Sequence, residues 1–274
     1  MTTNSTNKKV GVALGCGGWR GLAHLGVLKS LEKHEIEVSY VAGSSVGALV
    51  GGLYAFYGGI SELEKIVDSI GYRDLVMSLS DPTVKLGLLK GGKLVEFLEK
   101  HLQGAKIEDL KIPYKAVATD IITGESIFID KGSLSKAIRA SISIPIMLAP
   151  VPIEHRKLVD GGVSMPVPTK VVRDMGADVV IGVNLYGNIF PMTEALDNNA
   201  IRLSTREIFR LSYQMLLNKL ATENLEEADI ALNPKIKEGS FNIFKNFVRE
   251  KGTVKCGEEA MDEAIVDLKK LLEG

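Results

Sequence analysis

Residues 38–52 read VSYVAGSSVGALVGG, an apolar strand pattern that runs into a turn of small residues and then into an apolar helix pattern. The segment GSSVG at residues 43–47 matches the motif GxSxG, in which a sharp strand-to-helix turn projects the central serine outward. Ser45 is therefore a candidate nucleophile. Because GxSxG also arises by chance in turns of small residues, the motif alone leaves the chemistry open.

Strand and helix patterns alternate on both sides of this segment. Residues 8–14 form an apolar run, and apolar residues recur at helical spacing over 22–31. Further strands are predicted at residues 38–42, 114–122, 126–129, 151–153, 158–159 and 179–185. Further helices are predicted at 48–57, 61–70, 94–102 and 169–175, together with a short helix that passes through Ala137. Ser61 and Glu64 resemble a capping box at the start of the 61–70 helix. This alternation predicts an α/β fold in three layers, with a mostly parallel central sheet flanked by helices and an antiparallel hairpin insertion.

The length and composition fit one large domain. The chain has 274 residues, of which 45% are hydrophobic, enough for a sizeable core. We expect a disordered polar leader at residues 1–9 and a single domain at 10–274, with the motifs in about 10–185 and a helical part at about 200–274. Residues 73–89 show no clean periodicity and could form a mobile cap.

Charge and cysteine content restrict the partners and the compartment. Lys and Arg total 33 and Asp and Glu total 34, so no net field draws nucleic acid to the surface, and we expect no nucleic-acid binding. Two distant cysteines without metal-ligand spacing, and a first segment without a signal-peptide core, favour a cytoplasmic location. The uncharged run at 39–60 is long enough to span a bilayer, but six glycines and three serines dilute it, and a strand, turn and buried helix explain it better.

A glycine-rich loop, GCGGWRG at residues 15–21, lies between the first strand and the first helix. Such a loop offers free backbone amides beside a helix amino terminus, where an oxyanion can bind. A dinucleotide-binding GxGxxG loop is excluded by its spacing, since position 20 is arginine. A purely structural glycine turn remains the alternative.

The third feature is Asp160 in DGG, directly after the predicted 151–159 hairpin. Asp-Gly is also a common turn pair, so an ordinary hairpin exit would look the same.

Together these features strongly resemble the patatin-like phospholipase family. The resemblance runs from about Val10 to Leu185, and it includes LAHLGVLKSLE after the loop, GSSVGAL at the turn, and RASISIPIMLAPV before LVDGG. It implies Ser45 as the nucleophile, Asp160 as the second member of a Ser-Asp dyad, the amides of Gly17 and Gly18 as the oxyanion hole, and Arg20 as a brace for the loop. It also implies a fatty acyl ester, phospholipid or lysophospholipid substrate.

The sequence departs from the family pattern at two positions of the loop. Cys16 stands where the family usually has glycine, and Trp19 where it usually has a small or aliphatic residue. These departures put the loop geometry and the acyl-chain preference in doubt. They leave the dyad in place.

A Ser-Asp dyad would hydrolyse an ester through an acyl-enzyme, without a metal or another cofactor. An α/β-hydrolase triad is the alternative; it would combine Ser45 and His155 with Asp120 or Asp130. A catalytically silent lipid or protein binder, and an acyltransferase, are further alternatives.

A peripheral membrane contact could involve Leu86, Leu88 and Leu89 beside Trp19, although a buried helix turn explains these leucines equally well. The sequence does not indicate an oligomeric state.

Overall fold

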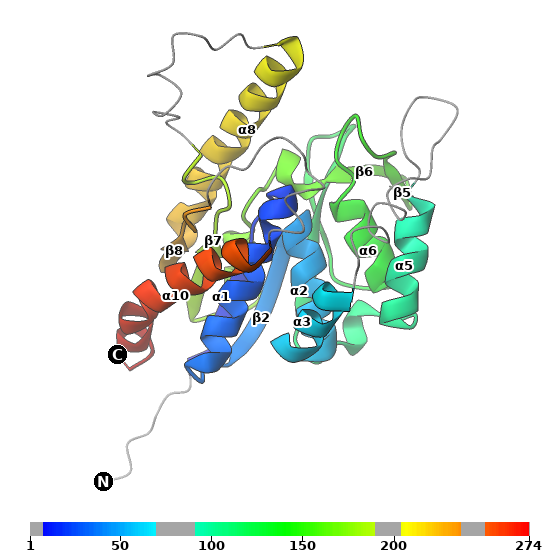
Figure 1. The fold of residues 1–274 in the computed structure, drawn as a ribbon. Helices are drawn as coiled ribbons and strands as arrows, with labels where there is room; N and C mark the ends of the chain where they lie inside the picture. Colours follow the sequence, from blue (N-terminus) through cyan, green and yellow to red (C-terminus); the bar gives the residue numbers. More distant parts are fainter. Residues whose placement is uncertain (1–7, 70–90, 190–203, 237–249, 274) are drawn as a thin grey trace.

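One sheet of eight strands runs through the protein (Figure 1). The computed structural model describes residues 8–69, 91–189, 204–236 and 250–273. The strands are β1 (Val10–Leu14), β2 (Val38–Ser44), β3 (Tyr114–Asp120), β4 (Ser126–Ile129), β5 (Val151–Ile153), β6 (Arg156–Asp160), β7 (Val179–Val183) and β8 (Ile230–Leu232). Their order is β5-β6-β3-β2-β1-β7-β8, and β4 pairs with β3 outside this path.

The sheet is mostly parallel, as predicted. Strands β3, β2, β1, β7 and β8 pair in parallel, whereas β4, β5 and β6 form antiparallel pairs at one end. Both predicted hairpins, β3–β4 and β5–β6, are confirmed. Strand β8 lies in the part predicted as helical, because three residues are too few to give a readable strand period.

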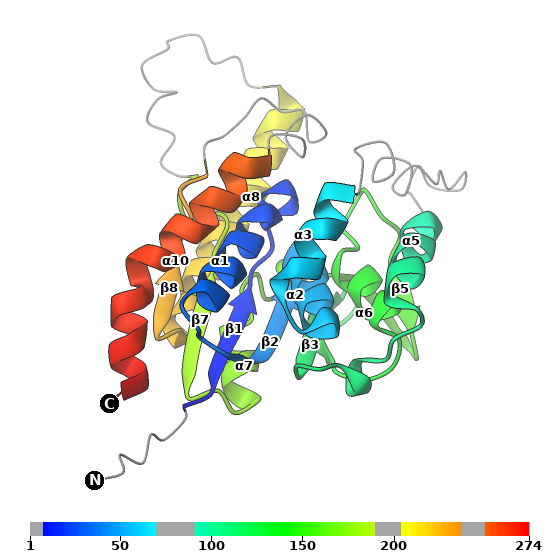
Figure 2. The same cartoon turned by 60° about the horizontal axis from the view of Figure 1, so that its bottom comes forward.

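Helices cover both faces of the sheet. They are α1 (Leu22–Lys33), α2 (Val46–Tyr57), α3 (Ile60–Ser69), α5 (Gly92–Leu102), α6 (Leu134–Ser141), α7 (Thr169–Asp174), α8 (Thr205–Asn224) and α10 (Glu250–Glu273). Figure 1 shows α1, α2 and α10 on one face of the sheet, and α7, which is labelled in Figure 2, packs on β1 and β2 with the residues of the other face. Successive residues of β1 point to opposite faces, so Val12 and Leu14 join the α1 side of the core while Ala13 packs with Val171 and Val172 of α7.

Helix α10 packs along α1, although the two helices lie near opposite ends of the chain (Figure 2). Glycines allow the two backbones to approach closely. A methyl group at Gly26 would lie 1.9 Å from the carbonyl oxygen of Val254, and one at Gly257 would lie 1.9 Å from that of Ala23. The two helices therefore form one tightly packed layer.

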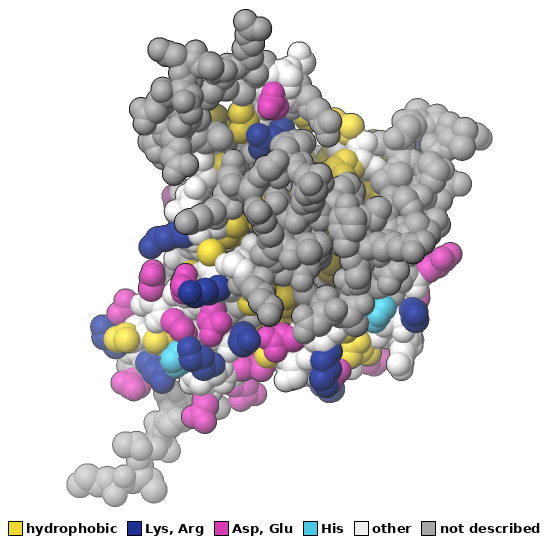
Figure 3. Space-filling view, in the orientation of Figure 1, with side chains coloured by type: hydrophobic (Ala, Val, Ile, Leu, Met, Phe, Trp, Pro, Cys, Tyr) yellow, Lys and Arg dark blue, Asp and Glu magenta, His cyan; other side chains and the backbone are white. Residues whose placement is uncertain are grey.

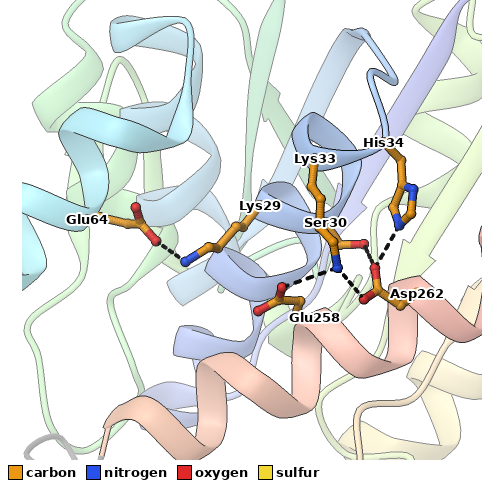
Figure 4. Close-up of polar contacts among 7 residues, drawn as sticks. All are labelled: Lys29, Ser30, Lys33, His34, Glu64, Glu258 and Asp262. Atoms are coloured by element: carbon orange, nitrogen blue, oxygen red, sulfur yellow. Dashed lines mark hydrogen bonds and ion pairs between the residues drawn. The ribbon is translucent and has the colours of Figure 1, made fainter.

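Asp262 of α10 joins this pair through a polar cluster (Figure 4). Its Oδ1 accepts a hydrogen bond from Ser30 Oγ at 2.5 Å and lies 3.0 Å from His34 Nε2. Its Oδ2 accepts from Lys33 Nζ at 2.9 Å. These three partners all come from the end of α1, so the cluster fixes the position of α10 along it.

The predicted capping box at Ser61 is wrong. Helix α3 begins at Ile60, which places Ser61 inside the first turn. The Ile60 amide instead donates to Glu32 Oε1 of α1 at 2.9 Å, so a side chain from another helix satisfies this terminus. A capping box does occur at Ser204 and Glu207, at the start of α8.

Several predictions fall on residues outside the described ranges: most of the leader at 1–9, the cap at 73–89, and the contact residues Leu86, Leu88 and Leu89. The uncharged run at 39–60 forms the rest of β2, the turn and the 12-residue helix α2. None of the helices in the described ranges is both long and apolar enough to cross a bilayer. Side chains of both charge signs are interspersed over the face formed by α1 and α10 (Figure 3).

Candidate active site

Ser45 lies in a sharp turn between β2 and α2. Its φ of 57° and ψ of −123° place a non-glycine residue in a rarely populated region, which costs about 1–3 kcal/mol and is typical of functional sites. The turn is tight enough to demand glycine beside it. A methyl group at Gly47 would lie 2.0 Å from the carbonyl oxygen of Leu14 in β1.

The topology brings the ends of β2 and β6 together. Both strands pair with the same edge of β3, since β4 occupies the other edge. Strand β2 is parallel to β3 and β6 is antiparallel to it, so their carboxyl ends meet. Ser44 is opposite Val117, and Asp160 is opposite the next residue, Ala118. The turn after β2 and the last residue of β6 are therefore adjacent, although they are distant in sequence.

Ser45 and Asp160 are joined by a short hydrogen bond. Ser45 Oγ donates to Asp160 Oδ2 at 2.6 Å, and the two residues are only 5% and 4% exposed. The other carboxylate oxygen, Oδ1, accepts from the Gly162 amide at 2.8 Å. Burial raises the pKa of Asp160 to about 6, although the hydrogen bonds from Ser45 and Gly162 act in the opposite direction. The carboxylate is thus a stronger base than an exposed aspartate, yet is mostly ionised at pH 7.

The glycine-rich loop is anchored at its start and open in the middle. The amides of Gly15 and Cys16 donate to the carbonyls of Val183 and Pro166. The amides of Gly17 and Gly18 have no acceptor within the described part of the chain. That these two amides bind an oxyanion stays a prediction from the loop pattern.

Arg20, which belongs to this loop, has a buried side chain. Its guanidinium carbon lies 5.2 Å from the ring centroid of Trp19 and 5.5 Å from that of Tyr186, distances typical of cation–π contacts. Trp19, one of the two departures from the family pattern, therefore packs on Arg20. Cys16, the other departure, is buried, and the pKa of its thiol is raised by burial and by the nearby charge of Asp160.

The alternative triad is not assembled. His155 lies in the exposed turn between β5 and β6, at the end of β6 opposite Asp160. Asp130 forms an ion pair with Lys115 at 3.2 Å, and Asp120 Oδ1 accepts the Ile122 amide at 3.0 Å. The Ser45 hydroxyl donates to Asp160 instead.

The sequence did not predict the residues that accept hydrogen bonds from the backbone amides of Ser45 and Asp160. Ser141, at the end of α6, accepts a hydrogen bond from the Ser45 amide through its Oγ at 2.9 Å. The carbonyl of Ser143 accepts the Asp160 amide at 3.0 Å. Both serines lie within the stretch RASISIPIMLAPV, which resembled the family but carried no pattern that assigns a role to either one.

Comparison with known proteins supports the resemblance over more than half of the chain. The profile of the patatin-like phospholipase family matches residues 12–173, more than half of the chain. An uncharacterized NTE family protein of Mycobacterium tuberculosis is 39% identical over 185 residues, which are 67% of this chain and 51% of the relative. The chain therefore spans about half the length of this relative.

Two eukaryotic relatives match over a similar number of residues. Patatin-like phospholipase domain-containing protein 6 of Homo sapiens is 32% identical over 187 residues, which are 66% of this chain and 14% of that protein. Lysophospholipase NTE1 of Debaryomyces hansenii is also 32% identical over 187 residues, 66% of this chain and 12% of that protein. The motifs, the site geometry and the extent of the profile match lead to one conclusion: the chain belongs to the patatin-like phospholipase family.

Proposed function

We propose that this protein is a serine acyl hydrolase that cleaves fatty acyl esters through a Ser45–Asp160 dyad. The observation that carries the proposal is the 2.6 Å hydrogen bond between Ser45 Oγ and Asp160 Oδ2 in a buried site. A serine hydroxyl needs a base within hydrogen-bond reach, and the raised pKa of Asp160 makes this carboxylate a suitable base.

In the first half of the reaction, Ser45 Oγ attacks the ester carbonyl carbon while its proton passes to Asp160. The carbonyl oxygen becomes an oxyanion, which the amides of Gly17 and Gly18 would stabilise by about 3 kcal/mol each. Arg20, packed between Trp19 and Tyr186, would hold this loop in place. Collapse of the tetrahedral intermediate breaks the ester bond, and Asp160 returns the proton to the leaving alkoxide.

In the second half, water attacks the acyl-enzyme. Asp160 accepts a proton from the water, the same two amides bind the new oxyanion, and the proton returns to Ser45 Oγ as the carboxylic acid leaves. Every proton transfer uses a group of the chain, so the proposed route requires no metal or other cofactor.

The substrate class rests on relatedness. The name of the Debaryomyces hansenii relative, a lysophospholipase, supports a phospholipid or lysophospholipid among the candidate esters. Contact with a lipid surface would follow from such a substrate. A cytoplasmic location is a proposal from the cysteine content.

The test is hydrolysis of a short-chain and a long-chain p-nitrophenyl ester by the wild type and by Ser45→Ala, Asp160→Asn and His155→Ala. Circular dichroism first establishes that all four proteins fold. We expect kcat to fall by roughly a thousandfold or more in the first two variants and to stay within about twofold in His155→Ala.

Other outcomes favour the alternatives. Full activity in Ser45→Ala would contradict the mechanism. Activity lost at Ser45 and His155 but kept in Asp160→Asn would favour the triad. A folded wild type that neither hydrolyses esters nor reacts with a fluorophosphonate at Ser45 would favour the silent binder.

A further inference from the structure

One short segment holds the main chain of both Ser45 and Asp160. The segment runs from Arg139 in α6 to Ala149, before β5. It supplies Ser141 Oγ to the Ser45 amide at 2.9 Å and the Ser143 carbonyl to the Asp160 amide at 3.0 Å. Any shift of this segment therefore changes the distance between the hydroxyl and the carboxylate.

Arg139 ties the two ends of the segment together. Its Nη1 donates to Ser143 Oγ at 2.6 Å, and its Nη2 donates to the Ala149 carbonyl at 3.0 Å. Ser143 Oγ in turn donates to the Arg139 carbonyl at 2.8 Å. The planar guanidinium reaches two acceptors on separate turns of the chain, a geometry that a lysine ammonium cannot reproduce.

The guanidinium is enclosed by protein. Arg139 is 4% exposed, and a methyl group at Gly91 would lie 2.4 Å from its Nε. Burying a charged side chain is unfavourable unless its donors are satisfied, so an apolar residue would serve packing better. Directed hydrogen bonds to Ser143 and Ala149 give the buried charge a specific role.

The segment between these two contacts contains a strained residue. Ile146 has a φ of 73°, which is rare for a β-branched side chain, in a turn where the Ile144 carbonyl accepts the amides of Met147 and Leu148. Such a conformation persists where its surroundings hold both ends of the turn. Arg139 provides this restraint.

We propose that Arg139 is a positioning residue for the dyad: it clamps the 143–149 segment and so fixes the Ser143 carbonyl that holds Asp160 against Ser45. The inference rests on the proposed function for its kinetic consequence. Its structural content, that Arg139 keeps the Asp160 carboxylate in its buried position, can be tested without any activity.

The experiment compares Arg139→Gln, Arg139→Lys and Ser143→Ala with the wild type. Ser143→Ala removes the hydroxyl that accepts from Arg139 but keeps the carbonyl that binds Asp160, so it isolates the clamp. Arg156→Gln is the matched control, because Arg156 lies on β6 itself but is exposed and pairs only loosely with Glu125 at 3.8 Å.

Two measurements are made on each folded variant: kcat and KM for ester hydrolysis, and the pKa of Asp160 from the ¹³C resonance of its carboxyl group. We expect kcat to fall by about ten- to a hundredfold in both Arg139 variants, with KM within about twofold, because the reacting groups are misplaced. Ser143→Ala should lose less, and the Arg139→Lys/Ser143→Ala double variant should lose no more than Arg139→Lys alone. Arg156→Gln should match the wild type.

The pKa separates positioning from other roles. A loosened segment admits water to the carboxylate, so the pKa of Asp160 should fall from about 6 toward its ordinary value. The other titratable groups near it, Cys16, Tyr186 and Tyr213, are unchanged in every variant. A rise would mean that Arg139 acts only as a nearby positive charge, and an unchanged pKa with unchanged kcat would mean that the clamp does not reach the dyad; either result overturns the inference.

Failure of the proposed function is distinguishable from failure of this inference. A wild type without esterase activity, combined with a lower Asp160 pKa in Arg139→Gln, would refute the function and leave the positioning role standing. An active wild type, combined with an unchanged pKa of Asp160 in every folded Arg139 and Ser143 variant, would support the function and refute the positioning role. If Arg139→Gln does not fold, Arg139→Lys and Ser143→Ala still decide between these outcomes.

Discussion

Two serine–aspartate pairs in this molecule have nearly the same hydrogen-bond length, but the surroundings of the two carboxyl groups shift their pKa values in opposite directions. Ser45 donates to Asp160 at 2.6 Å in the candidate active site, and Ser30 donates to Asp262 at 2.5 Å between α1 and α10. Asp160 is buried, and no ion pair to it occurs in the described part of the chain. Asp262 has a side chain 34% exposed, with Lys33 and His34 beside it (Figure 4).

The pKa values of the two carboxyl groups therefore move apart. Burial raises the pKa of Asp160 to about 6, whereas the hydrogen bonds from Ser30 and Lys33 lower that of Asp262 to about 2. A carboxylate with a pKa near 2 is a poor base. A serine beside an aspartate is thus not in itself a catalytic pair; the environment of the carboxylate decides whether it can take the proton.

The same substitution at both aspartates should separate the two regions by activity. Asp160→Asn removes the base, so kcat for ester hydrolysis should fall by roughly a thousandfold or more, whereas Asp262→Asn should stay within about twofold. The measurement is steady-state hydrolysis of a p-nitrophenyl ester. A comparable loss of kcat in the two variants would contradict the proposed difference between the two aspartates.

A second contrast concerns glycines near the start of two helices. A methyl group at Gly47 in α2 would lie 2.0 Å from the Leu14 carbonyl oxygen, whereas one at Gly252 in α10 would meet nothing within 4 Å. Gly47→Ala should lower the free energy of unfolding by about 3 kcal/mol or more, and Gly252→Ala should raise it by about 0.5–1 kcal/mol through helix propensity. Urea unfolding measures both; a neutral Gly47→Ala would mean that the turn is less tight than described.

The two aspartates should also affect stability with opposite signs. The raised pKa of Asp160 means that the folded state binds its proton more tightly than the unfolded state does, so stability falls as the pH rises from about 4 through about 6, and this loss is complete at pH 8. Asp160→Asn should therefore raise the free energy of unfolding at pH 8 by about 1–3 kcal/mol. Asp262→Asn should lower it by less than about 1 kcal/mol, since solvent screens that cluster. Denaturant titrations at pH 8 that gave both changes the same sign would contradict this account.

The smallest effect is the pH dependence of the Asp262 contribution. Its pKa is lowered from 3.8 to about 2 on folding, so its stabilisation is fully present above about pH 4 and is lost as the pH falls through 2. The difference in unfolding free energy between the wild type and Asp262→Asn should therefore shrink over this range. A difference that persisted at pH 2 would show that the cluster stabilises by packing alone.

The two regions differ also in how far the sequence predicts them. The strand, turn and helix around Ser45 are predictable because apolar periodicity and the small residues of GSSVG are local signals. The pairing of Ser45 with Asp160, 115 residues away, came from family resemblance, since no local pattern states which strand ends meet. The carboxyl ends of β2 and β6 lie next to each other only because of the order of the strands in the sheet, which no local pattern states.

Contacts that depend on the path of a loop were not predictable. The contacts of Arg139, Ser141 and Ser143 include side chain–backbone hydrogen bonds and the bond from the Asp160 amide to the Ser143 carbonyl, and none of these leaves a periodic pattern in the sequence. The start of α3 was misplaced for a similar reason, because Glu32 of another helix satisfies the Ile60 amide. The α1–α10 cluster joins the two ends of the described chain, and nothing local to Ser30 indicates Asp262 as its partner.

The most direct test of the central claim, that burial makes Asp160 the base for Ser45, is the pH dependence of fluorophosphonate labelling, with mass spectrometry to identify the labelled residue. The account predicts modification at Ser45, at a rate that rises with pH through a midpoint near 6, and a loss of labelling in Asp160→Asn. A midpoint near 4, or equal labelling rates in the wild type and Asp160→Asn, would contradict it.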